Sequence, residues 1–251
     1  MPSIRIADLD DPRVAMYRHL KDTNQTRYSG QFVVEGEKLV DRLLSSRFPV
    51  ASVLCTDRFE VEIALRVPSE TPIFVIDDAK IGDLVGYNFH RGVLACGVRT
   101  PWPEISSLVT GPSATLLICP RIDNPENLGA IARIADVFGV EAVIAGPRCP
   151  DPLSRRVIRV SMGSALAVPI VVAEDLAAEI GRLRQRLGFE TVATVVDPSA
   201  LPLDGYGRPA RLALCDRFLT IPMRPGAESL NVAVAAGILL YHLTRQSPTS
   251  L

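Results

Sequence analysis

Short apolar runs alternate with stretches of helical periodicity along most of this chain. In residues 1–100, two stretches with helical periodicity are VAMYRHL and GEKLVDRLLSS. Four apolar runs predict strands between and after them, namely FVVEG, VASVLCT, TPIFVID and GVLACGVR. This mixture indicates a small α/β domain over residues 1–100. Residues 101–113 are rich in Pro, Ser and Gly and predict a linker.

Strands and helices alternate more regularly in residues 114–251. Buried strands are predicted at TLLICP, EAVIAG, AVPIVVA and ETVATVV. Helices are predicted between them at NLGAIARIADVFG, SRRVIRVSMGSA and AEDLAAEIGRLRQRLG, with Gly139 and Gly188 at the ends of the first and third. This alternation is typical of a parallel sheet covered on both faces by helices. Ligands of such sheets bind beyond the carboxyl ends of the strands, so we expect the chemistry there.

The composition limits the classes of function. Hydrophobic residues make up 47% of the 251 residues and charged residues 22%, which excludes a disordered chain. The net charge is −1, so a nucleic-acid site would have to be a local patch. Five cysteines without a two-residue spacing predict a reducing compartment and no structural metal. Without an apolar leader or a run long enough to cross a membrane, the chain is predicted to be cytoplasmic with no membrane partner.

Several enzyme signatures are absent from the sequence. No G-x-G-x-x-G, P-loop, G-x-S-x-G or H-E-x-x-H occurs. Their absence disfavours a dinucleotide enzyme, a nucleoside triphosphatase, an esterase-type hydrolase and a zinc protease. A small-molecule enzyme on a doubly wound sheet is disfavoured for the same reason.

The first candidate site follows the strand TLLICP. Asn124, Asn127 and Gly129 lie at a strand-to-helix turn, where free helix amides favour polar ligands. Arg133 comes six residues after Asn127, so at 100° per residue the two side chains do not share a helix face. Two interpretations remain open. The segment is either a polar site that includes Arg133, or an Asn-capped helix with an Arg whose stem packs on apolar neighbours.

The second candidate site is the segment IPMRPGAESLNVAVAAGILLYHL near the C-terminus. Ser229 and Asn231 present a hydroxyl and an amide at the start of an Ala-rich helix, which we predict from Ser229 to Leu243 with Ser229 as its cap. A capped core helix without a binding role is the other interpretation. Because the helix is apolar on nearly every side, it is predicted to be buried and to take part in a symmetric homodimer.

A run of arginines precedes and enters the segment SRRVIRVSMGSA. A solvated surface is the usual explanation of such a run, and phosphate binding requires the same residues, so the run alone does not distinguish the two. The four candidate RNA contacts are Arg148, Arg155, Arg156 and Arg159.

The segments together resemble the SpoU (TrmH-like) branch of the SPOUT RNA methyltransferases. NPENLGAIARIADVFGV is similar to the first motif of that family, SMGSALAVPI to its middle signature and IPMRPGAESLNVAVAAGILLY to its last. FVVEGEKLVDRLL and HRGVLA resemble its substrate-binding domain. The resemblance implies a trefoil-knotted parallel-sheet domain over residues 114–251, preceded by an RNA-binding domain like certain ribosomal proteins. It also implies a homodimer that transfers a methyl group from S-adenosylmethionine to a ribose 2′-hydroxyl, in ribosomal RNA or, as the other candidate, transfer RNA.

The resemblance also implies roles for individual residues. Arg133 would deprotonate or orient the attacking hydroxyl, Asn127 would position the substrate, and Ser229 with Asn231 would complete the catalytic site. A sulfonium leaving group needs no acid, so positioning and help with one proton are the expected contributions. No metal is implied. The methyl donor would be held around Gly146, Ile221, Met223, Ser229 and Leu230.

One part of the family pattern is missing. A Gly-Glu-Gly-type loop and a short helix normally follow the strand that corresponds to RLAL, and they line the methyl-donor pocket. In this sequence Leu214 is joined directly to Cys215. The alternative function is therefore a catalytically impaired RNA-binding or assembly protein that keeps the fold.

Overall fold

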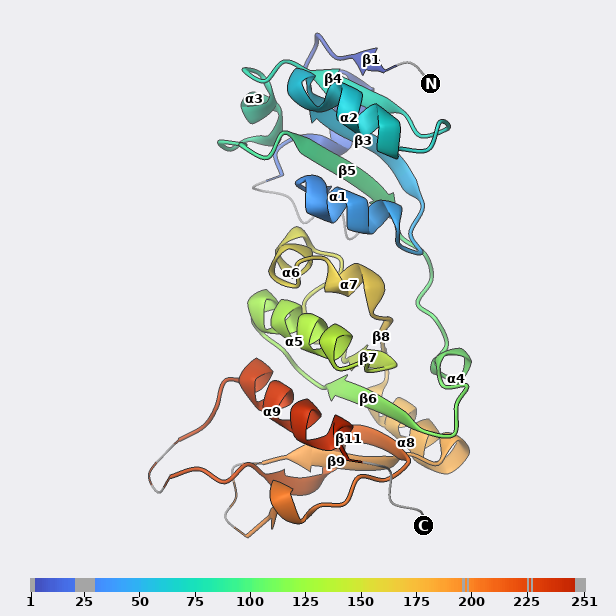
Figure 1. Cartoon of the computed structure of the whole chain (residues 1–251), viewed down its shortest axis with the longest axis vertical. Coiled ribbons are helices and arrows are strands. Elements are labelled where there is room, and N and C mark those ends of the chain that lie inside the picture. Colours follow the sequence, from blue (N-terminus) through green and yellow to red (C-terminus); the bar gives the residue numbers. More distant parts are fainter. Residues whose placement is uncertain are drawn as a thin grey trace. The chain divides into compact units, whose positions relative to one another are not determined.

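The computed structural model describes residues 3–20, 30–195, 197, 199–224, 226 and 228–246, with only the backbone described at 215–218. The chain divides into two compact units (Figure 1). Unit 1 comprises Met1–Pro101 and Leu153–Ala167, and unit 2 comprises Trp102–Pro152 and Val168–Leu251. The predicted linker 101–113 thus falls almost wholly in unit 2. It contains α4 (Ile105–Leu108), because Ile105 and Val109 are buried in the core of that unit.

Unit 1 is built on a mixed five-stranded sheet. The strand order is β1-β4-β3-β5-β2, with β5 antiparallel to both of its neighbours and the other pairs parallel. All four predicted strands form, and the predicted helix at VAMYRHL is a short 3-10 helix. The elements are β1 (Ile4–Arg5), η1 (Pro12–Tyr17), β2 (Gln31–Glu35), α1 (Glu37–Leu44), β3 (Val50–Thr56), η3 (Asp57–Phe59), α2 (Glu60–Arg66), β4 (Ile73–Ile76), α3 (Ile81–Val85) and β5 (Val93–Val98).

Two short helices of unit 1 come from the segment predicted as a single helix at SRRVIRVSMGSA. They are α6 (Arg155–Val160) and α7 (Ser164–Ala167). Between them Met162 has φ 53° and Gly163 has φ 86°, in the left-handed region, so the helix cannot continue. A Cβ at Gly163 would lie 2.6 Å from Cδ of Arg42 on α1. Close packing against α1 therefore requires glycine at the break.

A buried carboxylate joins α6 to the sheet of unit 1. Glu35, at the end of β2, accepts a hydrogen bond from Arg155 Nη2 at 2.7 Å and another from the Tyr87 hydroxyl at 3.0 Å. Arg91 adds an ion pair at 3.4 Å. The Glu35 side chain is 10% exposed and that of Arg155 23% exposed, so the pair is largely shielded from water. The pKa of Tyr87 is raised above its ordinary value, mainly by burial of the phenol.

We expect Arg155→Ala to lower the free energy of unfolding by about 3 kcal/mol, because it leaves the Glu35 carboxylate buried without its main partner. Denaturant unfolding measures the change. The control is Arg156→Ala, which removes the same charge from an exposed position on α6 and should cost less than about 1 kcal/mol. Equal losses in the two variants would contradict the assignment of a stabilising role to the buried pair.

Unit 2 contains a parallel sheet, as predicted. Its order is β10-β11-β6-β7-β8, and β9 also pairs with β11. Successive side chains of each strand point to opposite faces of the sheet, so the core has one part on each face. Leu116, Ile118 and Ile144 face a cluster that includes Leu183 of α8. Helices α5 and α9 lie side by side over the opposite face (Figure 1). The elements are β6 (Ala114–Cys119), α5 (Pro125–Val137), β7 (Ala142–Ala145), β8 (Ile170–Val172), α8 (Leu176–Leu187), β9 (Glu190–Thr194), β10 (Leu201–Pro202), η4 (Leu203–Gly205), β11 (Arg211–Thr220) and α9 (Val232–Thr244).

Strand β11 runs through the junction at which the family loop is missing. Leu214 pairs with Val192 of β9 and Phe218 pairs with the next residue, Ala193, so the register shifts between them. The chain joins RLAL to the segment before IPM as one irregular strand. The residues of IPM themselves are not in a strand, because β11 ends at Thr220.

The C-terminal helix begins later than predicted. Asn231, and not Ser229, caps α9: its side-chain oxygen accepts from the N–H of Ala233 at 2.9 Å and of Val234 at 3.4 Å. Asn is at least as good a cap as Ser, so the residue type did not distinguish the two positions. No helix in the described part of the chain is long and apolar enough to span a membrane.

Candidate active site

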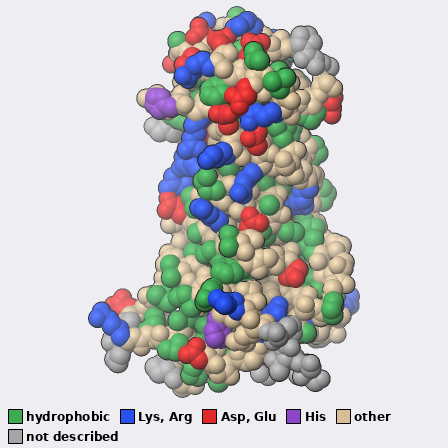
Figure 2. Space-filling view, in the orientation of Figure 1, with side chains coloured by type: hydrophobic (Ala, Val, Ile, Leu, Met, Phe, Trp, Pro, Cys, Tyr) green, Lys and Arg blue, Asp and Glu red, His purple; other side chains and the backbone are tan. Residues whose placement is uncertain are grey.

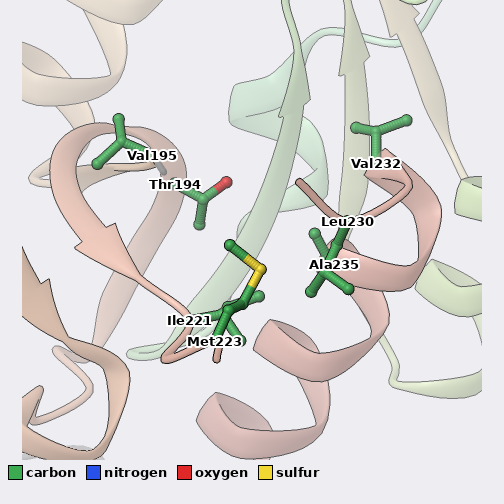
Figure 3. Close-up of a pocket in the computed structure, with 7 residues that line it drawn as sticks. All are labelled: Thr194, Val195, Ile221, Met223, Leu230, Val232 and Ala235. Carbon is green, nitrogen blue, oxygen red and sulfur yellow. The ribbon is translucent and has the colours of Figure 1, made fainter. Parts of the chain in front are cut away.

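A cavity of about 190 Å³ opens in unit 2 at the ends of two strands. Because the strands are parallel and β9 adjoins β11, their carboxyl ends lie at one edge of the sheet. Figure 3 shows the lining residues on three segments, with Met223 extending toward Thr194. They are Thr194 and Val195 at the end of β9, Ile221 and Met223 after β11, and Leu230, Val232 and Ala235 at the start of α9.

The cavity brings together three of the predicted donor-binding residues. Ile221, Met223 and Leu230 lie on its wall. Sequence reasoning missed the contribution of β9, although the rule that ligands bind beyond strand ends could have been applied to ETVATVV. Among the described lining residues only Thr194 carries a hydroxyl, and the others are apolar. Such a surface suits a flat, weakly polar group better than a charged one.

Two asparagines from distant parts of the sequence meet beside this cavity. Asn231 Nδ2 donates to Asn127 Oδ1 at 3.0 Å. Leu230 and Val232, the neighbours of Asn231 in the chain, both line the cavity. Asn127 is half-buried, in the first turn of α5, and Asn231 is exposed. The structure therefore joins the first and last predicted motifs through a hydrogen bond between side chains.

The cap interpretation of the first motif applies to Asn124 and not to Asn127. The Asn124 side chain accepts from the N–H of Glu126 at 2.8 Å and begins α5. Asn127 lies inside the helix. Its amide therefore makes the contact with Asn231 and takes no part in capping α5.

Arg133 and Ser229 are exposed, and neither lines the cavity. Within the described residues, Arg133 makes no ion pair or side-chain hydrogen bond. Its side chain is therefore free to contact a ligand. Packing of its stem on apolar neighbours, the other interpretation, is compatible with this exposure, so the catalytic role of Arg133 stays a prediction.

Gly146 follows β7 and packs against the turn after β6. Its N–H donates to the Cys119 carbonyl at 2.9 Å, and a Cβ at this position would lie 2.3 Å from the Pro120 carbonyl oxygen. The close approach of two backbones explains why glycine stands here. Gly146 does not line the cavity, so its predicted contact with the methyl donor stays a prediction.

The four arginines of the predicted RNA patch do not form one cluster within either unit. Arg148 is exposed in unit 2, whereas the other three lie on α6 in unit 1. Arg156 is exposed and Arg159 is half-buried. The guanidinium of Arg155 donates to the Leu20 carbonyl, the Glu35 carboxylate and the Tyr87 hydroxyl. These internal partners do not favour an RNA contact at Arg155, whose predicted role stays a prediction. Among the described residues no group of His, Cys, Asp and Glu side chains could hold a metal ion.

The parallel sheet, with a cavity beyond the carboxyl ends of its strands, is the arrangement of open-sheet α/β proteins, whose ligands bind at strand ends. The chain belongs to the SpoU rRNA Methylase family, which it matches over residues 114–209 and 207–241. The predicted family is thereby confirmed.

Individual relatives span nearly the whole chain. An uncharacterized tRNA/rRNA methyltransferase of Mycobacterium tuberculosis is 34% identical, covering 96% of this chain and 91% of the relative. The 23S rRNA (guanosine(2553)-2′-O)-methyltransferase RlmP of Bacillus subtilis is 27% identical over 95% of this chain and 98% of its own length. The fold is similar to that of the AdoMet-bound rRNA methyltransferase from Sinorhizobium meliloti, with a TM-score of 0.83, 22% identity and coverage of 97% and 98%.

The comparisons also bear on the missing loop. The alignment with the mycobacterial relative spans 264 positions, which is more than the 251 residues of this chain. The relative therefore has residues without a counterpart here. The family match comes in two parts that meet at residues 207–209, shortly before the junction of Leu214 and Cys215.

We expect Arg133→Ala to abolish methyl transfer while changing the free energy of unfolding by less than about 0.5 kcal/mol, because the side chain is exposed and has no internal ion pair in the described structure. Methyl-transfer assays and denaturant unfolding measure the two effects. Arg186→Ala, on the exposed side of α8, is the matched control and should change neither. A loss of several kcal/mol in the Arg133 variant would instead indicate a structural role.

Proposed function

We propose that this protein is an S-adenosylmethionine-dependent RNA 2′-O-ribose methyltransferase that acts on ribosomal RNA. The observation that carries the proposal is the hydrogen bond between Asn127 and Asn231 beside the cavity. It supports the proposal because two side-chain amides lie beside an apolar pocket, an arrangement that suits an acceptor nucleotide next to a methyl donor. Family membership and the 2′-O-methyltransferase named among the relatives support the same reaction.

The methyl donor supplies a methyl group on a sulfonium, which leaves without protonation. The chain's own residues have to hold the ribose hydroxyl in line and to help with one proton. Asn127 offers an amide for positioning. Arg133 brings a positive charge that favours the deprotonated form of a nearby hydroxyl. Ser229, three residues before the start of α9, completes the polar site.

The described lining fits one part of S-adenosylmethionine. The apolar side chains of Ile221, Met223 and Leu230 suit the flat adenine ring, and the Thr194 hydroxyl can bond one polar atom. At about 190 Å³ the cavity is smaller than the roughly 300 Å³ at which pockets for drug-sized ligands begin. The cavity would therefore hold only part of the donor, and its charged amino-acid end would need other residues.

We assign RNA binding to unit 1, with Arg156 and Arg159 as phosphate contacts, and add Arg148 from unit 2. Arginines on short helices give bidentate contacts to phosphate oxygens. We also assign to unit 2 the trefoil knot of the SPOUT proteins, with α9 as the threaded segment.

The test of the reaction is a map of 2′-O-methylation in ribosomal and transfer RNA from cells with and without the gene. We expect one or a few ribosomal nucleotides to lose the modification and to regain it on incubation of that RNA with purified protein and S-adenosylmethionine. Loss confined to transfer RNA would move the substrate to that class. An unchanged map would favour the catalytically impaired RNA-binding protein.

A second prediction follows from the continuous course of β11. Without the loop the donor loses two or three hydrogen bonds at roughly 0.5–1.5 kcal/mol each, which weakens binding by about ten- to a thousandfold. Calorimetry should therefore show S-adenosylmethionine binding weaker than micromolar, while RNA binding persists and weakens as salt rises. Absent donor binding would favour the catalytically impaired RNA-binding protein. Micromolar donor affinity would show that another segment has replaced the loop.

We further propose a homodimer formed through α5 and α9. Figure 2 shows hydrophobic side chains gathered over the region that α9 occupies in Figure 1. Val137 is 72% exposed, Val234 50%, Ile238 38% and Tyr241 54%. The rings of Tyr241 and Phe138 pack edge to face with their centroids 6.4 Å apart. This contact joins the two helices into one surface. An exposed apolar face of this kind marks a protein interface, and a C2 dimer would bury it twice.

Sedimentation velocity at micromolar concentration should therefore give a dimer, and Ile238→Glu should convert it to a monomer by placing a charge in the interface. Val61→Glu is the control, since Val61 is also exposed, at 76%, but lies on α2 in unit 1. A wild-type monomer would overturn the proposal.

A further inference from the structure

We propose that Asn231 is a positioning residue that fixes the orientation of the Asn127 side-chain amide, so that Asn127 meets RNA with hydrogen-bond donors. The proposal rests on the proposed function and specifies the polarity of the acceptor-nucleotide site.

The orientation of Asn231 is determined by the helix that it caps. Its side chain faces the backbone N–H groups of Ala233 and Val234, at 2.9 and 3.4 Å. Since backbone N–H groups only donate, the atom facing them has to be the amide oxygen. The NH₂ group of Asn231 is therefore on the other side of its amide plane.

This NH₂ group determines the orientation of Asn127 in turn. It lies 3.0 Å from the Asn127 side chain, and an N–H donor has to meet an acceptor, which is Asn127 Oδ1. Asn127 Nδ2 then points away from Asn231 and has no hydrogen-bond partner among the described residues. Asn127 is only half-buried, so this NH₂ group can reach a ligand.

On RNA an NH₂ group can donate to ribose, phosphate and base acceptors. Because the proposed reaction takes place at a ribose hydroxyl, we infer that Asn127 meets an oxygen of the ribose or of the adjoining phosphate. An amide NH₂ holds such an oxygen in place and cannot take its proton. Asn127 therefore positions the RNA and does not act as the base.

The test reverses the polarity of the pair without shortening either side chain. In Asn231→Asp the carboxylate still caps α9, because Asp and Asn are equally good caps. It has no N–H to donate, so Asn127 forms a hydrogen bond with it only by turning its amide over. The oxygen of Asn127 then faces the RNA. We expect stability close to that of the wild type, with RNA affinity and kcat/KM reduced about tenfold or more.

A matched control separates polarity from charge. Asn124→Asp adds the same negative charge at a cap that performs the same task for α5 and does not orient Asn127. A smaller loss in this variant supports the proposal, and an equal loss overturns it, since charge alone would then explain the effect. If Asn231→Asp is unstable, Asn127→Asp replaces it: its carboxylate still accepts from Asn231 and likewise presents oxygen to the RNA.

The RNA probe is a synthetic 20-nucleotide strand around the mapped ribosomal nucleotide. A 2′-deoxy substitution at that nucleotide removes the ribose oxygen, and a methylphosphonate linkage removes one charged phosphate oxygen. The substitution that weakens wild-type binding but no longer weakens the Asn231→Asp variant identifies the oxygen that Asn127 holds. If neither substitution behaves in this way, Asn127 does not contact the RNA as proposed.

A measurement of the Asn127 amide orientation without RNA tests the inference independently of the proposed methyl transfer. Nuclear Overhauser contacts between the Asn127 NH₂ protons and the Hβ protons of residue 231 should be absent in the wild type and appear in Asn231→Asp. Their presence in the wild type would overturn the inference even if methyl transfer is found. Their absence would support the amide orientation even if methyl transfer is not.

Discussion

The parallel pairing of β11 between β6 and β9 is the constraint on which the site in unit 2 depends. Leu212 and Leu214 of β11 pair with Thr115 and Leu117 on one side, and the same strand pairs with β9 on the other. Because all three strands run in one direction, the segments that follow them emerge at a single edge. The turn that carries Asn127, the end of β9 and the segment leading to α9 meet there for this reason. They are separated by up to about a hundred residues in the sequence.

The sequence allowed much of this arrangement to be predicted, because strands buried on both faces are continuous apolar runs and helices carry their own start and stop signals. TLLICP and EAVIAG became β6 and β7, and Gly188 ends α8 in the left-handed conformation. What the pattern could not decide were choices between neighbours of similar chemistry. Ser229 and Asn231 are both good caps, and only the packing of α9 beside α5 selects the second. At the break between α6 and α7, Gly163 packs against Arg42, a residue more than a hundred positions away in the sequence.

The arginines on α6 show that the sequence pattern also cannot decide which residues bind a ligand. A run of cations is compatible with phosphate binding on charge alone, but burial decides which guanidinium groups are exposed to a ligand. Arg155 is used within unit 1 by Glu35 and Tyr87, and its neighbour Arg156 is exposed. The two arginines are adjacent in the sequence, so the local pattern cannot explain why one is half-buried and the other exposed. The difference arises because Glu35 of β2 lies beside Arg155. Polar residues that serve the fold and those that serve a ligand can be separated only when their partners are known.

Unit 1 consists of two separate stretches of the chain, and this affects its folding during synthesis. Residues 1–101 leave the ribosome first, but α6 and α7 belong to the same unit and follow only after β6, α5 and β7 have been synthesised. Until residue 155 emerges, the Glu35 carboxylate lacks its main cationic partner, and the surface of α1 around Leu39 and Arg42 lacks its cover. Independent domains can fold one after another as they are synthesised. The N-terminal half cannot do so, because its native packing requires α6 and α7. Folding of the two units is consequently coupled in time by the connectivity of the chain.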